Sequence, residues 1–299
     1  MTQAAMMPAP FKVLIGKDGW LYLDNDSNGV VEQICGQKLF SPKELETWRL
    51  TLETRDAWLK RKGIRYYYLI APENHVTYPE YLPDGIALAP VRPVLQLLDH
   101  LKQKASLVPI YPLHDLREHK KDGLVSIQTD SHWSHYGAFI AYRVLMREIS
   151  KAFPGLRILD FDDIAFDRRQ FAGDLGNKFT PAIMGEMMYG QVKARQAKLL
   201  SDNKVVGGGN IRVFENPDKT LPKAVFFRDS FGQATSPFMA ESFSRVVEVH
   251  TPLLEHDIVE AEKPDVVLNL LCERFMIRIP NDLKDEKANE LAAARTASQ

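Results

Sequence analysis

Cysteine is scarce in this chain. Only Cys35 and Cys272 occur among its 299 residues. A structural zinc site needs several ligands at short paired spacings, and two cysteines this far apart do not form such a pattern. We interpret them as two separate thiols. A disulfide between them stays open at this point, because its formation depends on geometry that a sequence does not give.

An excess of positive charge and long apolar runs are also missing. The formal net charge is −1, so no broad basic field exists that would attract nucleic acid. No apolar run approaches the roughly 18 residues that a membrane-spanning helix requires. Residues 1–12 lack the basic start and the apolar core of a secretory signal. We therefore expect a cytoplasmic protein as the sequence stands, and a periplasmic one if the sequence has been trimmed.

The remaining composition is that of a globular protein. Hydrophobic residues make up 45% of the chain and charged residues 26%, which is enough for a substantial core. No internal repeat or low-complexity block divides it. We predict a single domain over residues 1–282, with a small irregular insertion at about 155–222 and a C-terminal helix or tail over 283–299.

Apolar runs of strand length alternate with segments of helical periodicity. The pattern Ser41-Pro42-Lys43-Glu44 predicts a capped helix start, and the apolar run Ile64–Ala71 predicts a strand buried on both faces. The other predictions are a hairpin over 11–23, helices over 91–104, 134–152, 232–243 and 256–262, and strands over 106–111, 224–227, 245–250 and 265–271. This alternation predicts an α/β fold with a parallel sheet and helices on both faces. Active residues of such folds gather beyond the carboxyl ends of the strands.

One serine lies at such a position. Ser230 follows the strand predicted at 224–227 and precedes a predicted helix. The N-terminus of that helix would direct backbone N–H groups and a positive partial charge toward a developing oxyanion. This position suits a nucleophile. Alternatively, Asp229 or Ser230 could simply cap the helix.

A serine nucleophile needs a base, and the segment 129–137 offers one. Its sequence is T-D-S-H-W-S-H-Y-G, in which Asp130 lies two residues before His132. Histidine accepts a proton near neutral pH, and a carboxylate can hold its ring in the required tautomer. His132 could instead be a structural loop residue. A second histidine, His135, falls inside the helix start and has no aspartate two residues before it.

Several segments resemble the SGNH hydrolase-like O-acetyltransferases of the alginate acetylation proteins AlgX and AlgJ. They occur in the family's order, span most of residues 11–276, and are the following: G-K-D-G-W-L-Y-L (16–23), I-A-P-E-N-H-V-T-Y-P-E-Y-L-P (70–83), T-D-S-H-W-S-H-Y-G (129–137), G-D-L-G (173–176), F-F-R-D-S-F-G (226–232) and V-L-N-L-L-C-E-R-F (267–275). The resemblance implies a circularly permuted SGNH-hydrolase-like domain, because the Asp/His segment precedes the Ser segment.

The same resemblance implies roles for individual residues. Asp130, His132 and Ser230 fall on the family's triad positions, and Gly137 matches the glycine that starts a helix five residues after the histidine. No metal or cofactor is implied beyond an acetyl donor as substrate.

The chain also departs from the family's pattern at three positions. Arg228 replaces the superfamily's glycine before Asp-Ser, Ser131 stands where threonine is expected, and Asn74 stands where relatives often carry lysine. The change at Asn74 affects the expected substrate contacts more than the triad.

Four further residues are candidates for contact with substrate or oxyanion. Arg274, Asn74, Arg228 and Trp133 all belong to the matched segments. Arg274 could instead form a surface ion pair with its neighbour Glu273, and Trp133 could pack over the histidine or line a sugar subsite. For Asp174, in the Gly-flanked turn, we expect a structural role.

Three functions follow from these residues. In the first, Ser230 transfers an acetyl group through an acyl-enzyme to a hydroxyl of a bacterial polysaccharide or its saccharide precursor, with an acetyl-supplying membrane protein as a candidate partner. In the second, the same triad acts as a carbohydrate acetylesterase, with water as acceptor. In the third, the protein binds saccharide without catalysis, which the bulky Arg228 beside the nucleophile would favour.

Overall fold

A six-stranded, mostly parallel sheet forms the centre of the protein. The computed structural model describes residues 12–282. Four strands run parallel in the order β3-β10-β8-β9, and β7 and β6 extend the sheet antiparallel at one edge. Their bounds are β3 (Arg65–Ala71), β10 (Val266–Cys272), β8 (Lys223–Arg228), β9 (Arg245–His250), β7 (Ile211–Glu215) and β6 (Lys198–Asp202). The predicted α/β sheet is confirmed, with antiparallel strands added at one edge.

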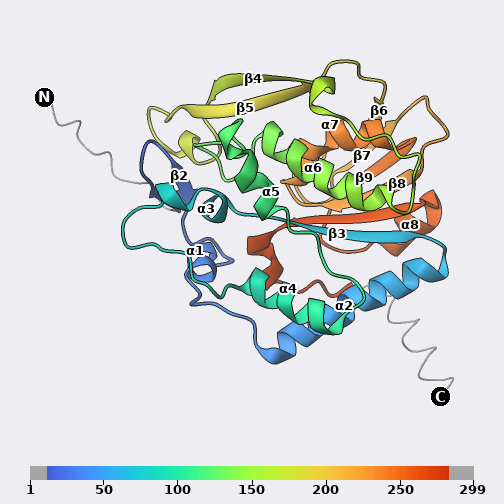
Figure 1. Ribbon diagram of the computed structural model, residues 1–299, viewed down its shortest axis with the longest axis horizontal. Coiled ribbons are helices and arrows are strands. Elements are labelled where there is room, and N and C mark those ends of the chain that lie inside the picture. The colour runs from blue at the N-terminus through green and yellow to red at the C-terminus, as the bar shows by residue number, and fades with distance from the viewer. Residues whose placement is uncertain (1–11, 283–299) are drawn as a thin grey trace, which may run out of the picture.

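Helices cover both faces of this sheet, as the alternating pattern predicted (Figure 1). One face packs on α6 (His135–Ser150) and α7 (Gly232–Ser242), with α5 (Leu113–Glu118) beyond them. The opposite face packs on α2 (Pro42–Arg61), α4 (Pro93–Lys104) and α8 (His256–Glu262). The two cores are separate clusters of apolar side chains, one on each face.

Local sequence signals explain where two of these helices begin. Ser41 accepts a hydrogen bond from the Glu44 N–H, and the Glu44 carboxylate accepts one from the Ser41 N–H, so the predicted capping box of α2 is present. The Ser134 hydroxyl caps α6 by accepting from the Gly137 N–H at 3.1 Å.

Helices α6 and α7 are joined to each other. The Tyr142 hydroxyl of α6 lies 2.6 Å from the Ser242 hydroxyl at the end of α7 and also accepts from the Leu159 N–H. The ring of Phe139 packs edge-on against Phe238 in the same contact. The candidate site lies where these two helices begin.

The segment at about 155–222 contains two pairs of strands. Strands β4 (Ile164–Phe171) and β5 (Gly185–Val192) form a separate antiparallel ribbon, seen above α6 in Figure 1. Strands β6 and β7 pair antiparallel with each other, and β7 continues the main sheet beside β9. The Gly173–Gly176 turn lies between β4 and β5.

One predicted strand is wrong. Residues 106–111 contribute only a single bridge, between Ile110 and Leu69 of β3. Pro109 and Pro112 explain this, because proline has no backbone N–H to donate to a ladder.

Short elements complete the structure. The predicted N-terminal hairpin is β1 (Val13–Ile15) paired with β2 (Leu21–Leu23), and two short helices are α1 (Val30–Ile34) and α3 (Asn74–Thr77). The C-terminal helix or tail predicted over 283–299 lies outside the described residues. Within residues 12–282, no helix combines the length and apolarity needed to cross a membrane.

Candidate active site

Ser230 lies at the carboxyl end of β8, immediately before α7. Its neighbour Asp229 is buried, accepts from the Phe231 N–H at 2.8 Å, and accepts from the Cys272 N–H at 2.6 Å. Asp229 therefore ties the turn that carries Ser230 to the end of the adjacent strand β10. The Ser230 side chain makes no capping hydrogen bond to α7. Of the two residues considered for that role, Asp229 bonds the N–H of Phe231, the residue before the helix.

The three predicted triad residues meet at this edge of the sheet. His132 Nε2 lies 2.7 Å from Ser230 Oγ, and His132 Nδ1 lies 2.7 Å from Asp130 Oδ1. The Asp130 Oδ1 atom also accepts from the His132 N–H at 2.9 Å. With Asp130 accepting the Nδ1 proton, Nε2 is free to accept the Ser230 hydroxyl proton. His135 lies elsewhere, with Nδ1 2.9 Å from the Gly190 carbonyl.

The charges around His132 favour its role as a base. Burial disfavours the imidazolium, but the hydrogen bond to Asp130 and the negative charge of Asp130 outweigh it and raise the pKa of His132 above its usual value. Burial likewise disfavours the Asp130 carboxylate, yet the contact with His132 lowers the pKa of Asp130. The pair is thus built to accept a proton on the imidazole while the aspartate stays ionised.

Trp133 and Phe231 hold the two halves of the site together. The Trp133 indole N–H donates to the Phe231 carbonyl at 2.9 Å, and the Phe231 ring packs 4.8 Å from the His132 ring. Trp133 is only 2% exposed, which favours the packing role considered for it, and contact with substrate stays a prediction. It positions the residue that follows the nucleophile.

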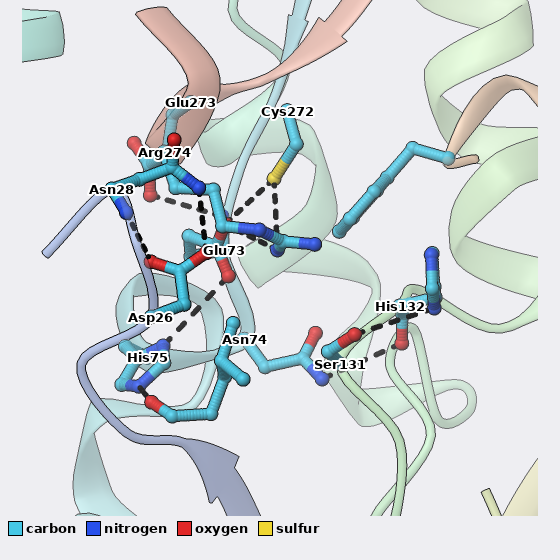
Figure 2. Close-up of polar contacts among 12 residues, drawn as sticks. Asp26, Asn28, Glu73, Asn74, His75, Ser131, His132, Cys272, Glu273 and Arg274 are labelled. Carbon is cyan, nitrogen blue, oxygen red and sulfur yellow. Dashed lines mark hydrogen bonds and ion pairs between the residues drawn. The ribbon is translucent and has the colours of Figure 1, made fainter. Parts of the chain in front are cut away.

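Asn74 also positions the site. Its amide nitrogen donates to the Asp130 carbonyl at 2.8 Å and to the His132 carbonyl at 3.4 Å, the latter drawn in Figure 2. Both amide hydrogens are used, and the side chain is buried. The predicted role of Asn74 in holding an oxyanion is therefore not available in this arrangement.

Arg274 is part of a buried ion pair. Its Nη1 lies 2.6 Å from Glu73 Oε1, and the Cys272 thiol donates to the same oxygen (Figure 2). The side chains of Arg274 and Glu73 are 6% and 1% exposed, so a surface ion pair is ruled out. The guanidinium lies over the Phe231 ring, 5.4 Å from its centroid, and is shielded from solvent. It therefore packs against the residue that follows the nucleophile.

Arg274 does not pair with its neighbour Glu273. Glu273 is also buried, with its carboxylate bonded to the Tyr111 hydroxyl and the Glu73 N–H. The two cysteines are separate thiols.

Ser230 opens onto a cleft of about 420 Å³ that the sequence did not predict. Its walls come from the segment after β6, from β7, and from the ends of β8 and β9. The lining residues are Asp202, Lys204, Val205, Val206, Gly207, Asn210, Arg212, Arg228, Ser230, Gln233 and His250. Arg228 is thus the candidate that does lie beside the nucleophile, although its side chain is only 2% exposed. His250 lies at the carboxyl end of β9, a position at which the parallel-sheet rule could have found it.

Three side chains could offer donor atoms to a metal ion. Donor atoms of Asp130, His132 and Asp174 lie within 4.8 Å of one another. These atoms, however, take part in the hydrogen bonds of the triad and of Ser131. The arrangement fits a hydrogen-bonded Ser-His-Asp chain.

A nucleophile on a strand-to-helix turn, with a histidine and an aspartate from another loop, defines a serine-triad α/β protein. Residues 13–203, well over half of the chain, match the family model described as the SGNH hydrolase-like domain of the acetyltransferase AlgX. The chain therefore belongs to this family. The match includes Asp130 and His132 and ends before Ser230, whose place depends on the geometry above.

Individual proteins of known family also resemble this chain. The chain is 29% identical over 142 residues to a probable alginate O-acetylase AlgJ of Pseudomonas syringae pv. tomato, covering 48% of this chain and 34% of that protein. For the corresponding protein of Pseudomonas fluorescens the identity is 30% over 145 residues, with 48% and 34% covered. The chain spans about a third of the length of these curated relatives.

Solved structures share the fold. Bacillus cereus PatB1 matches with a TM-score of 0.67 at 16% identity, covering 90% of this chain and 99% of that one. The O-acetyltransferase domain of Pseudomonas putida AlgJ matches with a TM-score of 0.57 at 20% identity, covering 91% and 94%. These likenesses confirm the SGNH-like fold class.

Proposed function

We propose that this protein is an O-acetyltransferase that passes an acetyl group through Ser230 to a saccharide hydroxyl. The observation that carries the proposal is the chain of two 2.7 Å contacts from Asp130 through His132 to Ser230, in a member of an acetyltransferase family. The arrangement supplies a nucleophile, a base and a group that orients the base.

The reaction follows from these positions. His132 Nε2 takes the hydroxyl proton as Ser230 Oγ attacks the acetyl carbonyl of the donor, and His132 then gives the proton to the departing group. Among residues 12–282, no acceptor bonds the Ser230 N–H, which leaves it free for the oxyanion. In the second half, His132 takes the proton of the acceptor hydroxyl as its oxygen attacks the acetyl-serine, and then gives this proton to the departing Ser230 Oγ, which restores the free enzyme.

The acceptor that fits best is a saccharide with a carboxylate. Three cations line the cleft, Lys204, Arg212 and Arg228. Lys204 pairs with Asp202, and both arginines pair with the buried Glu248, so this set carries one net positive charge. The two Pseudomonas relatives above are named probable alginate O-acetylases, and the carboxylate of a uronate acceptor would be attracted by the remaining positive charge. An acetyl-supplying membrane protein and the compartment stay predictions from the resemblance.

The experiment is acetyl transfer from an activated acetyl ester to oligouronates by Ser230→Ala. Turnover is expected to fall by at least about a thousandfold, because the covalent intermediate cannot form. Ser150→Ala, at the exposed end of α6, is the matched control and should keep wild-type activity. Unchanged transfer by the Ser230 variant would rule the proposal out.

The openness of the site keeps esterase activity as a second candidate. Ser230 is only partly buried and borders the open cleft, so water can reach it. Product analysis separates the two functions, since acetylated sugar indicates transfer and free acetate alone indicates hydrolysis. Stoichiometric labelling of Ser230 by a sulfonyl fluoride would count against a protein that only binds saccharide.

A further inference from the structure

A turn outside the triad encloses the loop that carries Asp130 and His132. This turn, Gly173–Gly176, follows β4 and belongs to the segment at about 155–222. The backbone N–H groups of Leu175 and Gly176 donate to the Thr129 carbonyl at 3.2 and 2.9 Å. A Cβ placed on Gly173 would collide with Asp130 Cβ and with the Thr129 carbonyl, so this close approach requires glycine.

Asp174 forms the tip of this turn and contacts the first two residues of the Asp-x-His motif, Asp130 and Ser131. Its N–H donates to Asp130 Oδ2 at 2.8 Å, the carboxylate oxygen that does not contact His132. Its carboxylate accepts from the Ser131 N–H at 2.7 Å and from the Ser131 hydroxyl at 2.6 Å. Asp174 thus fixes the position of Asp130 directly and the position of His132 through Ser131.

We propose that Asp174 is a positioning residue of the triad, which holds the Asp130–His132 pair at bonding distance from Ser230. This inference rests on the function proposed above. It also explains the hydroxyl at position 131, because a residue without one could not make the 2.6 Å bond to Asp174. Catalysis depends on alignment within fractions of an ångström, so loss of this support should reduce the rate of the chemical step.

Asp174 also contributes charge. The groups that act on His132 are the carboxylates of Asp130 and Asp174, which favour the imidazolium, and the guanidinium of Arg274, which disfavours it. Burial lowers the pKa of His132, and the negative charges overcome it. Removing the Asp174 charge should therefore lower the pKa of His132.

The test compares Asp174→Asn with Ser131→Ala and wild type, using hydrolysis of an activated acetyl ester across pH. For Asp174→Asn we expect kcat to fall about tenfold with KM nearly unchanged, and the acid limb of kcat/KM to move to lower pH. For Ser131→Ala we expect a drop in kcat of about threefold without that shift, because the Asp174 charge stays. Asp174 is exposed, so its substitution should leave the fold intact.

The matched control is Asp167→Asn. Asp167 is also exposed, and its two carboxylate oxygens contact Arg169 on the same strand. The proposal is overturned if Asp174→Asn behaves like this control, or if it raises KM and leaves kcat unchanged, which would make Asp174 a substrate contact.

Direct NMR titration of His132 tests the inference without turnover. A lower His132 pKa in Asp174→Asn supports it even if Ser230 proves inactive, in which case the proposed function alone fails. An unchanged pKa together with wild-type kcat rejects the positioning role.

Discussion

At the scale of single residues, the site depends on how His132 is surrounded. The ring lies between Ser230 on one side and Asp130 on the other, and the Phe231 ring packs beside it. The negative charges of Asp130 and Asp174 favour the imidazolium, and the positive Arg274, which is paired with Glu73, opposes them less strongly. This balance makes protonation of His132 easier than in water.

The pH dependence of the wild type follows from that balance. Because the pKa of His132 is raised above its ordinary 6.5, the neutral base is lost as the pH falls through a value higher than 6.5. The acid limb of kcat/KM for an activated acetyl ester should therefore have its midpoint above pH 6.5.

Asp130→Asn should change both the rate and this midpoint. The acid limb of kcat/KM should move to lower pH, because the hydrogen bond to the Asp130 carboxylate and its negative charge both raise the His132 pKa and are both lost. In addition, kcat should fall by about 10³- to 10⁴-fold. A midpoint that stays in place in Asp130→Asn would contradict this assignment of the charge.

At the scale of elements, the sequence predicted most strands and helices, because each is a long apolar run or a strong periodic pattern. It also located Asp130, His132 and Ser230, since strand ends and helix starts are visible in the pattern. It did not predict the role of Asn74, because a side chain that bonds two backbone carbonyls leaves no periodic signal. Arg274 was named as a candidate, but its burial was not predicted, since isolated charged residues are usually expected at the surface.

The start of α6 shows an element whose position depends on one glycine. A Cβ on Gly137 would collide with the Val125 carbonyl, which itself accepts from the Ser134 N–H that precedes the helix. Gly137→Ala should lower the free energy of unfolding by about 1–3 kcal/mol, because backbone must move to make room.

Urea unfolding measures this effect. Gly155→Ala is the control, since a Cβ there meets nothing within 4 Å, and it should change stability by no more than about 0.5 kcal/mol. Equal stability of the two variants would show that α6 does not need the close contact.

At the scale of the whole molecule, ion pairs differ in what they connect. Glu73 follows β3 and Arg274 follows β10, so their buried pair joins the carboxyl ends of two neighbouring strands behind the site. Lys62 and Glu260 join α2 to α8 at the surface, with side chains 37% and 55% exposed. Solvent screens the second pair and leaves the first unscreened.

Glu73→Gln should therefore destabilise the protein by about 3 kcal/mol, because Arg274 would be left buried beside a neutral partner. Glu260→Gln should cost less than about 1 kcal/mol. Equilibrium unfolding in urea compares the two, and similar losses would mean that the Arg274 charge finds another partner.

The contact between Tyr142 and Ser242 has a consequence for inactivation by heat. It links the two helices that follow His132 and Ser230 in the chain, so we expect these groups to stay together while the interior stays packed. On warming, loss of turnover should coincide with cooperative unfolding, and no folded but catalytically inactive state should accumulate below the melting temperature.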